Sequence, residues 1–367
     1  MRPAVRTASL IVLGALGLAF ATKAADDLDI FIQSEMSKRE IHGLSIAIIQ
    51  DGKIEARAYG VIAPGGPSVT TSTLFQAGSI SKPVAATGAL KLVEAGRLSL
   101  DADVNEQLRS WKVPENEFTT TQKVTLRRLL SHTAGLTVHG FPGYDVKERM
   151  PSVVQVLNGE GNTAPVRVDV LPGSNWRYSG GGYTVMQQLV ADVAGQPFPQ
   201  FMTEAVLEPL SMTRSTYEQP LPAARAAETA SGFFANKSAV AGRWHVYPEM
   251  AAAGLWTTPT DLARFAIAVQ QSLAGTSNKV LSQAMTRQQL TPQMNNFGLG
   301  LALSGNGAAR TFGHNGRDEG FDALLLAFAE TGQGVVIMIN ANDNSRVMNL
   351  IVDFVARRNK WPLRTAA

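Results

Sequence analysis

The chain has 367 residues, of which 45% are hydrophobic and 17% are charged. This is the composition of a folded globular protein with a large core. Three of its 33 basic residues lie within the first 24 positions, so the remainder balances the 30 acidic residues. The charge therefore gives no indication of a nucleic-acid partner. The absence of cysteine excludes disulfides, thiolate chemistry and lipidation on cysteine.

The first 24 residues have the pattern of a signal peptide. Arg2 and Arg6 precede an apolar stretch at residues 8–21, and Ala19-Phe20-Ala21 fits a cleavage site. A cut after Ala24 fits as well, and the alternative is an uncleaved anchor. We expect export to a bacterial periplasm or beyond, with no stable membrane span left after cleavage.

The next segments predict a helix and a hairpin, followed by helices. Apolar residues at helical spacing predict a helix over 27–39. Asp51-Gly52 joins two β-rich runs, 44–50 and 53–60, as a hairpin turn does. Further helices are predicted from Ser79 to Gly96, over 125–130 with an end at Gly135, and over 183–194 with an end at Gly195.

The last third of the chain changes from helix to strand. A helix is predicted over 260–272, capped by Thr260. Four runs then indicate an antiparallel meander: 297–304, 310–312, 321–330 and 335–340. Apolar residues between 347 and 355 form one stripe of a final helix.

These elements predict an α+β fold in one domain over residues 25–360. The sheet would form from both chain ends, about 26–75 and 290–360, and would be flanked by helices. A mostly helical region, about 76–289, would be inserted between them.

Ser79-Ile80-Ser81-Lys82 is the only Ser-x-x-Lys in the chain. Ser79 and Lys82 would share one helix face, and Pro83 places them in a first helical turn, where the macrodipole favours negative charge. A serine becomes nucleophilic when a base takes its proton. A lysine can be that base if burial lowers its pKa.

Three further segments complete a recognisable set: Leu129–Leu136, Pro172–Tyr183 and Phe312–Gly316. Together with Ser79-x-x-Lys82, they resemble the serine β-lactamase and penicillin-binding-protein superfamily. Its signatures are Ser-x-x-Lys, Tyr-x-Asn and Lys-Thr-Gly or His-x-Gly, in that order. The closer resemblance is to the branch of class C β-lactamases, D-Ala-D-Ala carboxypeptidases, D-aminopeptidases and family VIII esterases. It extends from about Ile41 to about Val355. The resemblance implies the same two-region layout, with the active site in the cleft between the two regions, where concave sites commonly lie.

The resemblance implies catalytic roles for three side chains. Ser79 would be the nucleophile, Lys82 its partner, and Tyr178 a base or proton shuttle. Tyr178 would need cationic neighbours to act as a phenolate near neutral pH. Which of Lys82 and Tyr178 takes the first proton stays open. The alternative for Tyr178 is a core aromatic.

The same resemblance implies binding roles around the nucleophile. Backbone N–H groups of Ser79 and Arg317 would form the oxyanion hole, and Gly180, His314, Asn315 and Gly316 would bind substrate. His314 could instead be a solvated turn residue, and His132 is expected to be structural. The residues 138–144 are expected to form a loop over the cleft. No cofactor or metal is expected, and the partner would be a small-molecule or short-peptide substrate.

Two positions depart from the family pattern. Gly180 stands where the family has asparagine, and His314 stands where it often has a lysine. Both argue against an efficient β-lactamase, since an amide and a permanent cation are missing. We expect an exported serine hydrolase acting on esters, small amides or D-amino-acid peptides. The alternatives are a class C-like β-lactamase or D-Ala-D-Ala carboxypeptidase, with Arg317 binding a carboxylate, and a non-catalytic β-lactam or peptide sensor. The sequence does not indicate the oligomeric state.

Overall fold

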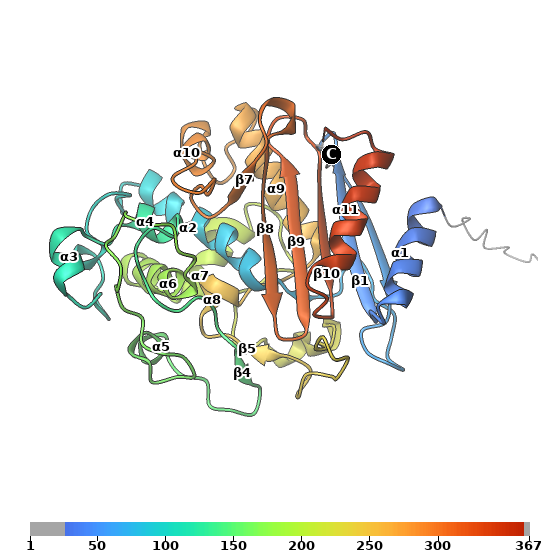
Figure 1. Ribbon diagram of the computed structural model, residues 1–367, viewed down its shortest axis with the longest axis horizontal. Coiled ribbons are helices and arrows are strands. Elements are labelled where there is room, and N and C mark those ends of the chain that lie inside the picture. Colours follow the sequence, from blue (N-terminus) through green and yellow to red (C-terminus); the bar gives the residue numbers. More distant parts are fainter. Residues whose placement is uncertain (1–25, 363–367) are drawn as a thin grey trace, which may run out of the picture.

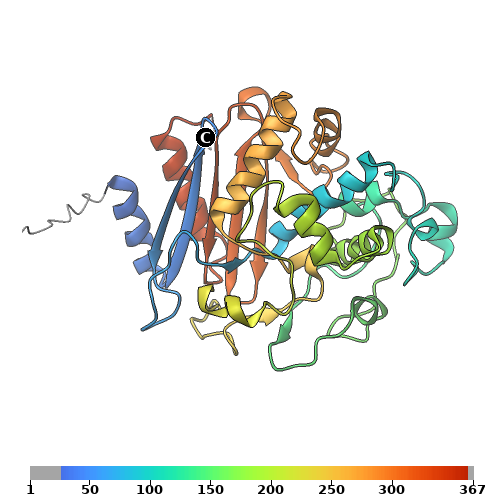
Figure 2. The same ribbon diagram turned by 180° about the vertical axis from the view of Figure 1, so that it is seen from behind.

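The computed structural model describes residues 26–362 (Figures 1 and 2). The predicted signal peptide, residues 1–24, lies outside the described residues. Helix α1 covers Asp27–Lys38, and strands β1 (Gly43–Gln50) and β2 (Lys53–Gly60) form the expected hairpin. Gln50 pairs with Lys53, and Asp51 and Gly52 both have positive φ, 51° and 72°, as a tight two-residue hairpin turn requires.

One antiparallel sheet combines the two ends of the chain. Its strand order is β2-β1-β10-β9-β8-β7. The C-terminal strands are β7 (Ala302–Ser304), β8 (Thr311–Asp318), β9 (Phe321–Phe328) and β10 (Gly334–Ile339). Leu44 of β1 lies opposite Ile339 of β10, so the join between the chain ends is in the middle of the sheet. The prediction of a sheet built from both ends is confirmed.

Helices cover both faces of this sheet. Helices α1 and α11 (Arg346–Arg358) lie on one face, and α9 (Pro259–Ala274) lies on the other (Figures 1 and 2). The two-residue period of a strand explains the separation. Val335, Ile337 and Ile339 of β10 join the core with α1 and α11, while Val336 and Met338 join the larger core with α9.

The inserted region is mostly helical and lies against β8 (Figure 1). It begins with a 3₁₀ turn, η1 (Gly78–Ile80), that leads into α2 (Ser81–Glu94). The other helices are α3 (Glu117–Thr121), α4 (Leu126–Leu130), α5 (Val153–Asn158), α6 (Gly180–Ala194), α7 (Phe198–Met202), α8 (Met250–Ala253) and α10 (Gln283–Gln289). Two-residue strands complete it: β3 (Phe75–Gln76) with β6 (Trp256–Thr257), and β4 (Tyr144–Asp145) with β5 (His245–Val246).

Some predicted boundaries are wrong. Helix α4 ends before His132, whose φ is 61°, and not at Gly135. The N-cap of α9 is Thr258, which accepts the N–H of Asp261, and not Thr260. Strand β8 continues to Asp318, six residues beyond its predicted end at 312. That extension matters because it carries the His314-Asn315-Gly316 motif as strand.

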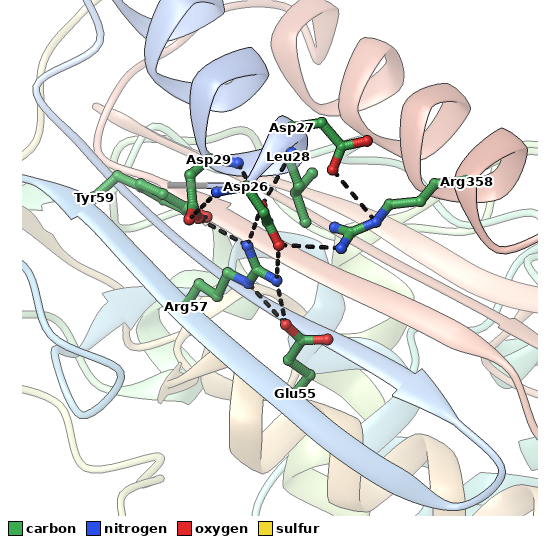
Figure 3. Close-up of polar contacts among 8 residues, drawn as sticks. All are labelled: Asp26, Asp27, Leu28, Asp29, Glu55, Arg57, Tyr59 and Arg358. Carbon is green, nitrogen blue, oxygen red and sulfur yellow. Dashed lines mark hydrogen bonds and ion pairs between the residues drawn. The ribbon is translucent and has the colours of Figure 1, made fainter. Parts of the chain in front are cut away.

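An ion-pair cluster ties the first described residues to the sheet and to α11 (Figure 3). Asp26 caps α1 by accepting the N–H groups of Leu28 and Asp29. Arg57 of β2 donates to Asp26 and Asp29 at 2.7 and 2.8 Å. Arg358 of α11 also donates to Asp26, at 3.0 Å. The start of α1 is therefore held by charges from two other elements.

Within residues 26–362, no helix combines the length and the apolar character that crossing a bilayer requires.

Candidate active site

Ser79 lies on the η1 turn, where the helical region touches residues 316–317 of β8, beyond the part of that strand that pairs with β7. Gly78 has a φ of 51°, and a Cβ at this position would lie 2.3 Å from the backbone nitrogen of Arg317. A glycine is therefore required for both its conformation and its space. Ser81 fixes the turn, since its hydroxyl donates to Gly78 O at 2.6 Å and accepts the N–H of Leu255.

Lys82 is the only cation in direct contact with Ser79 among the described residues. Its Nζ donates to Ser79 Oγ at 2.9 Å and to the carbonyl of Ala252 at 2.7 Å, and its side chain is 2% exposed. Desolvation lowers the pKa of Lys82 to about 7, with the charge of Asp318 opposing the shift. Lys82 is thus partly neutral near neutral pH and can accept the Ser79 proton.

Tyr178 completes the trio that the sequence predicted. It lies just before α6, beside the Ser79 side chain, and its ring centroid is 4.9 Å from Lys82 Nζ. Desolvation raises the pKa of Tyr178 well above 10 despite this neighbour. Lys82 supplies only part of the positive charge that a phenolate would need near neutral pH, because its own pKa is about 7. Tyr178 is a protonated phenol that can donate or relay a proton.

His132 packs against the ring of Tyr178 and hydrogen bonds with the residue that follows Tyr178. Its Nδ1 accepts the N–H of Ser179 at 3.1 Å, and its ring centroid lies 4.2 Å from that of Tyr178. Burial lowers the pKa of His132 well below 6.5, so the ring is neutral. A hydrogen bond between His132, just after α4, and a backbone group fits its expected structural role, which stays a prediction.

Strand β8 presents alternate residues to the helical region. Gly316 packs so closely on Ala77 that a Cβ would lie 1.9 Å from the Ala77 carbonyl oxygen. His314 and Asp318 lie two positions to either side and share its face. The alternative of a solvated turn is wrong for His314, because it is a strand residue. Desolvation and the charge of Lys82 lower the pKa of His314 to about 4, so it carries no positive charge at neutral pH.

Arg317 places its backbone and its side chain in different surroundings. The backbone lies against Gly78, next to Ser79. The guanidinium points to the α11 side, where Nη1 donates to Asn344 Oδ1 at 2.6 Å and Nε lies 3.6 Å from Asp322 Oδ1. The arrangement fits the predicted oxyanion hole, but the donor roles of the Ser79 and Arg317 N–H groups stay a prediction.

Two cavities meet at Ser79. One, of about 570 Å³, is lined by apolar side chains, by the predicted binding residues and by further polar side chains: Trp176, Phe297, Ala302, Leu303, His314, Asn315, Gly316, Asn295, Asn296, Asp322, Asn344 and Ser345. The smaller, about 250 Å³, is lined by Lys82, Gly140, Phe141, Ala252, Ala253, Asp318 and Glu319. Ser79, His139, Tyr178 and Arg317 line both. A larger cavity of about 680 Å³, beside Gln270, Arg287 and Arg310, holds none of the predicted site residues.

Gly180 is not where the sequence predicted. It is buried at the start of α6 and lines neither cavity at Ser79. A Cβ here would lie 3.0 Å from the Phe141 ring and 3.1 Å from the His139 carbonyl oxygen. The loop that crosses the cleft therefore occupies the space that the family's asparagine side chain would take.

Sequence reasoning assigned no definite role to Asp318 and Phe141, which line the smaller cavity, or to Glu249, which lines neither cavity. Asp318 could have been found, because it continues the alternation His314, Gly316, Asp318 along one strand. Phe141 was assigned only to a cleft loop. Glu249, which precedes α8, is fully buried, and burial raises its pKa to about 8. No sequence signal marks that burial.

Within the described part of the chain, no group of three or more His, Asp or Glu side chains is placed to hold a metal ion.

Comparison with known proteins identifies several similar chains. The sequence model of the family described as Beta-lactamase matches residues 28–357. Penicillin-binding protein 4 of Amycolatopsis lactamdurans is 28% identical over 325 residues, which are 83% of this chain and 82% of that protein. Other curated relatives are longer, and the match spans 64% and 62% of two of them.

Two solved structures share the fold. The octameric penicillin-binding protein homologue from Pyrococcus abyssi has a TM-score of 0.74 at 21% identity, over 91% of this chain and 77% of that one. The D-amino acid amidase from Ochrobactrum anthropi SV3 has a TM-score of 0.72 at 21% identity, over 91% of this chain and 99% of that one.

Proposed function

The chain belongs to the beta-lactamase family of serine hydrolases, and on this premise we propose that it cleaves esters and small amides through an acyl-enzyme on Ser79. The observation that carries the proposal is the 2.9 Å contact between Ser79 Oγ and the Nζ of a buried lysine with a pKa of about 7. A base of that pKa is matched to work near neutral pH. The protonated Tyr178 beside it adds a proton relay.

In the proposed reaction, Lys82 accepts the Ser79 proton as Oγ bonds to the substrate carbonyl carbon. The carbonyl oxygen becomes an oxyanion, held by the N–H groups of Ser79 and Arg317. The tetrahedral adduct collapses, and the alkoxide or amine leaves with the proton from Lys82, relayed by Tyr178. A water molecule then attacks the acyl-enzyme by the same route, which frees the acid and restores Ser79.

The charges around the larger cavity support substrates without a carboxylate. His314 is neutral at neutral pH, and the Arg317 guanidinium is already shared by Asp322 and Asn344. A carboxylate entering this cavity would have to compete with Asp322 for its cation. We therefore propose that esters and small amides are turned over faster than penicillins and cephalosporins.

A second candidate function is favoured by the relatives. A penicillin-binding protein at 28% identity supports a β-lactam or cell-wall peptide as substrate. The amidase neighbour shares the fold at 21% identity, and a D-amino acid amide is a further candidate substrate. A non-catalytic sensor is disfavoured, since it has no need of a lysine with a lowered pKa. We further propose export to the periplasm, tested by the N-terminal mass of the mature protein.

The test of the proposed function is covalent labelling combined with a substrate panel. A fluorophosphonate probe should label the wild type once, at Ser79, and should not label Ser79→Ala. Short-chain nitrophenyl esters, a D-alanyl anilide and a chromogenic cephalosporin should then be compared by kcat/KM. Faster turnover of the cephalosporin than of the esters would overturn the ester assignment. Labelling of Ser79 without turnover of any substrate would favour the sensor.

A further inference from the structure

The smaller cavity beside Ser79 has an acidic wall that the reaction above does not use. Asp318 and Glu319 lie at the end of β8, and both line this cavity. Asp318 is 5% exposed, and its Oδ2 has no hydrogen-bond partner among the described residues. Burial raises the pKa of Asp318 well above 3.8, so a cation bound at this oxygen would favour the ionised form. A buried carboxyl oxygen that lines a cavity and has no partner in the described chain can accept a hydrogen bond from a ligand there.

In the part of the chain that the structure describes, no nearby cationic side chain is bonded to the carboxyl groups of Asp318 and Glu319. Arg317 directs its guanidinium to Asn344 and Asp322. Lys82 lies within Coulombic range of Asp318, but its Nζ donates to Ser79 and Ala252. The Glu319 carboxylate makes no hydrogen bond or ion pair within residues 26–362, although its N–H donates to Tyr247. Two carboxyl groups therefore face the cavity without a partner of opposite charge bonded to them.

We propose that this cavity binds an ammonium group carried by the acyl part of the substrate, with Asp318 as the principal acceptor and Glu319 as the second. The inference rests on the proposed function and specifies its substrate class. The substrates would be esters or amides of amino acids with a free amino group. At about 250 Å³, the cavity suits a small cation. The larger, aromatic cavity on the other side of Ser79 would take the apolar part.

The geometry of β8 explains why one substrate can use both cavities. His314 and Asp318 share a strand face and are separated by Gly316, whose missing side chain leaves Ala77 and the η1 turn in contact with the strand. A carbonyl carbon at Ser79 Oγ would thus have the acidic cavity on the Asp318 side and the aromatic cavity on the His314 side.

Ammonium binding would also assist catalysis. Asp318 is the one group that raises the pKa of Lys82. A substrate cation bound to Asp318 would take over this countercharge and add a positive charge beside Lys82. Both effects favour neutral Lys82, which is the form that accepts the Ser79 proton.

The test compares substrates that differ only in the ammonium group. The methyl esters of D- and L-phenylalanine and of 3-phenylpropanoic acid should be assayed near neutral pH. We expect kcat/KM to be about ten- to a hundredfold higher for at least one phenylalanine ester than for the phenylpropanoate. Asp318→Asn should reduce this ratio to near one, and Glu319→Gln should reduce it about threefold. Asp353→Asn, on the exposed face of α11, is the matched control and should keep the wild-type ratio.

Several outcomes would overturn the inference. A wild-type ratio near one would do so, whatever the variants show. If Asp318 only tunes Lys82, Asp318→Asn should slow both esters by the same factor and preserve the ratio. If Asp318→Asn does not fold, the wild-type ratio and Glu319→Gln decide. If no ester is hydrolysed, binding to Ser79→Ala can be measured by calorimetry instead. Phenylalaninamide should then bind at least tenfold tighter than 3-phenylpropanamide. Equal binding of the two amides would refute the cation site. This result does not depend on turnover, so it is distinct from a failure of the proposed function.

Discussion

Glu249 is the residue whose replacement tests the electrostatics of this interior most directly. Its side chain is fully buried, and neither carboxyl oxygen has a hydrogen-bond partner among the described residues. Burial raises its pKa from 4.5 to about 8. It also begins α8, whose Ala252 carbonyl accepts from Lys82. We predict that Glu249→Gln removes a pH-dependent loss of stability.

The sign follows from proton binding. Between pH 4.5 and 8 the folded protein keeps the Glu249 proton, whereas the unfolded chain releases it. Stability therefore falls as pH rises through this window and levels off above pH 8. Each pH unit changes the free energy of unfolding by about 1.4 kcal/mol, so this group alone removes about 3 kcal/mol between pH 5 and neutral pH. Glutamine has a similar shape but does not titrate.

The assay is urea unfolding of both proteins from pH 5 to pH 8.5. The buried amide that Glu249→Gln introduces would lower stability by about 1–3 kcal/mol at every pH, so the slope and not the offset is the result. The difference between variant and wild type should move in favour of the variant by about 4 kcal/mol across the range, because the window from pH 5 to pH 8 spans three pH units. Glu330→Gln, at an exposed position, should run parallel to the wild type. Parallel curves for Glu249→Gln as well would show that Glu249 is ionised in the folded protein and refute the reasoning.

Four further predictions follow from the site and the terminal cluster. Lys82→Arg should reduce kcat by about 10²–10⁴-fold, because arginine keeps the charge but cannot accept the serine proton; near wild-type turnover would remove Lys82 as the base. The wild-type kcat/KM should rise with pH through an apparent pKa near 7, the pKa of Lys82, and a profile flat from pH 6 to 8 would contradict this. Arg57→Ala should lower stability by about 1–2 kcal/mol at neutral pH and by less in acid. The pKa of each aspartate paired with Arg57 is lowered in the folded state, so the stability that each pair contributes is lost as pH falls below about 4. An unchanged acid-unfolding curve would exclude a role for the cluster. Gly180→Asn should lower stability by about 1–3 kcal/mol without raising cephalosporin turnover, and Phe141→Ala should relieve the loss if Phe141 fills that space.

The sequence alone determined the parts of this protein that depend on local spacing. Ser79 and Lys82 are one helical turn apart, so their contact needs only the turn that Pro83 and the following apolar residues specify. The hairpin at Asp51-Gly52 and the alternating apolar runs of the C-terminal strands are local in the same way. Order and spacing of the motifs were enough to identify the superfamily and its α+β architecture.

The tertiary structure alone decided the chemistry of the site. The contacts of Lys82 with Tyr178 and Ala252, and of Gly78 with Arg317, join positions far apart in the chain, and no local pattern encodes such distances. The protonation states depend on them, because desolvation and neighbouring charge set a pKa only once the surroundings are assembled. Tyr178 and Lys82 illustrate this point: from their residue types the phenol could have been the base, but the buried interior keeps Tyr178 protonated and brings Lys82 to a pKa of about 7.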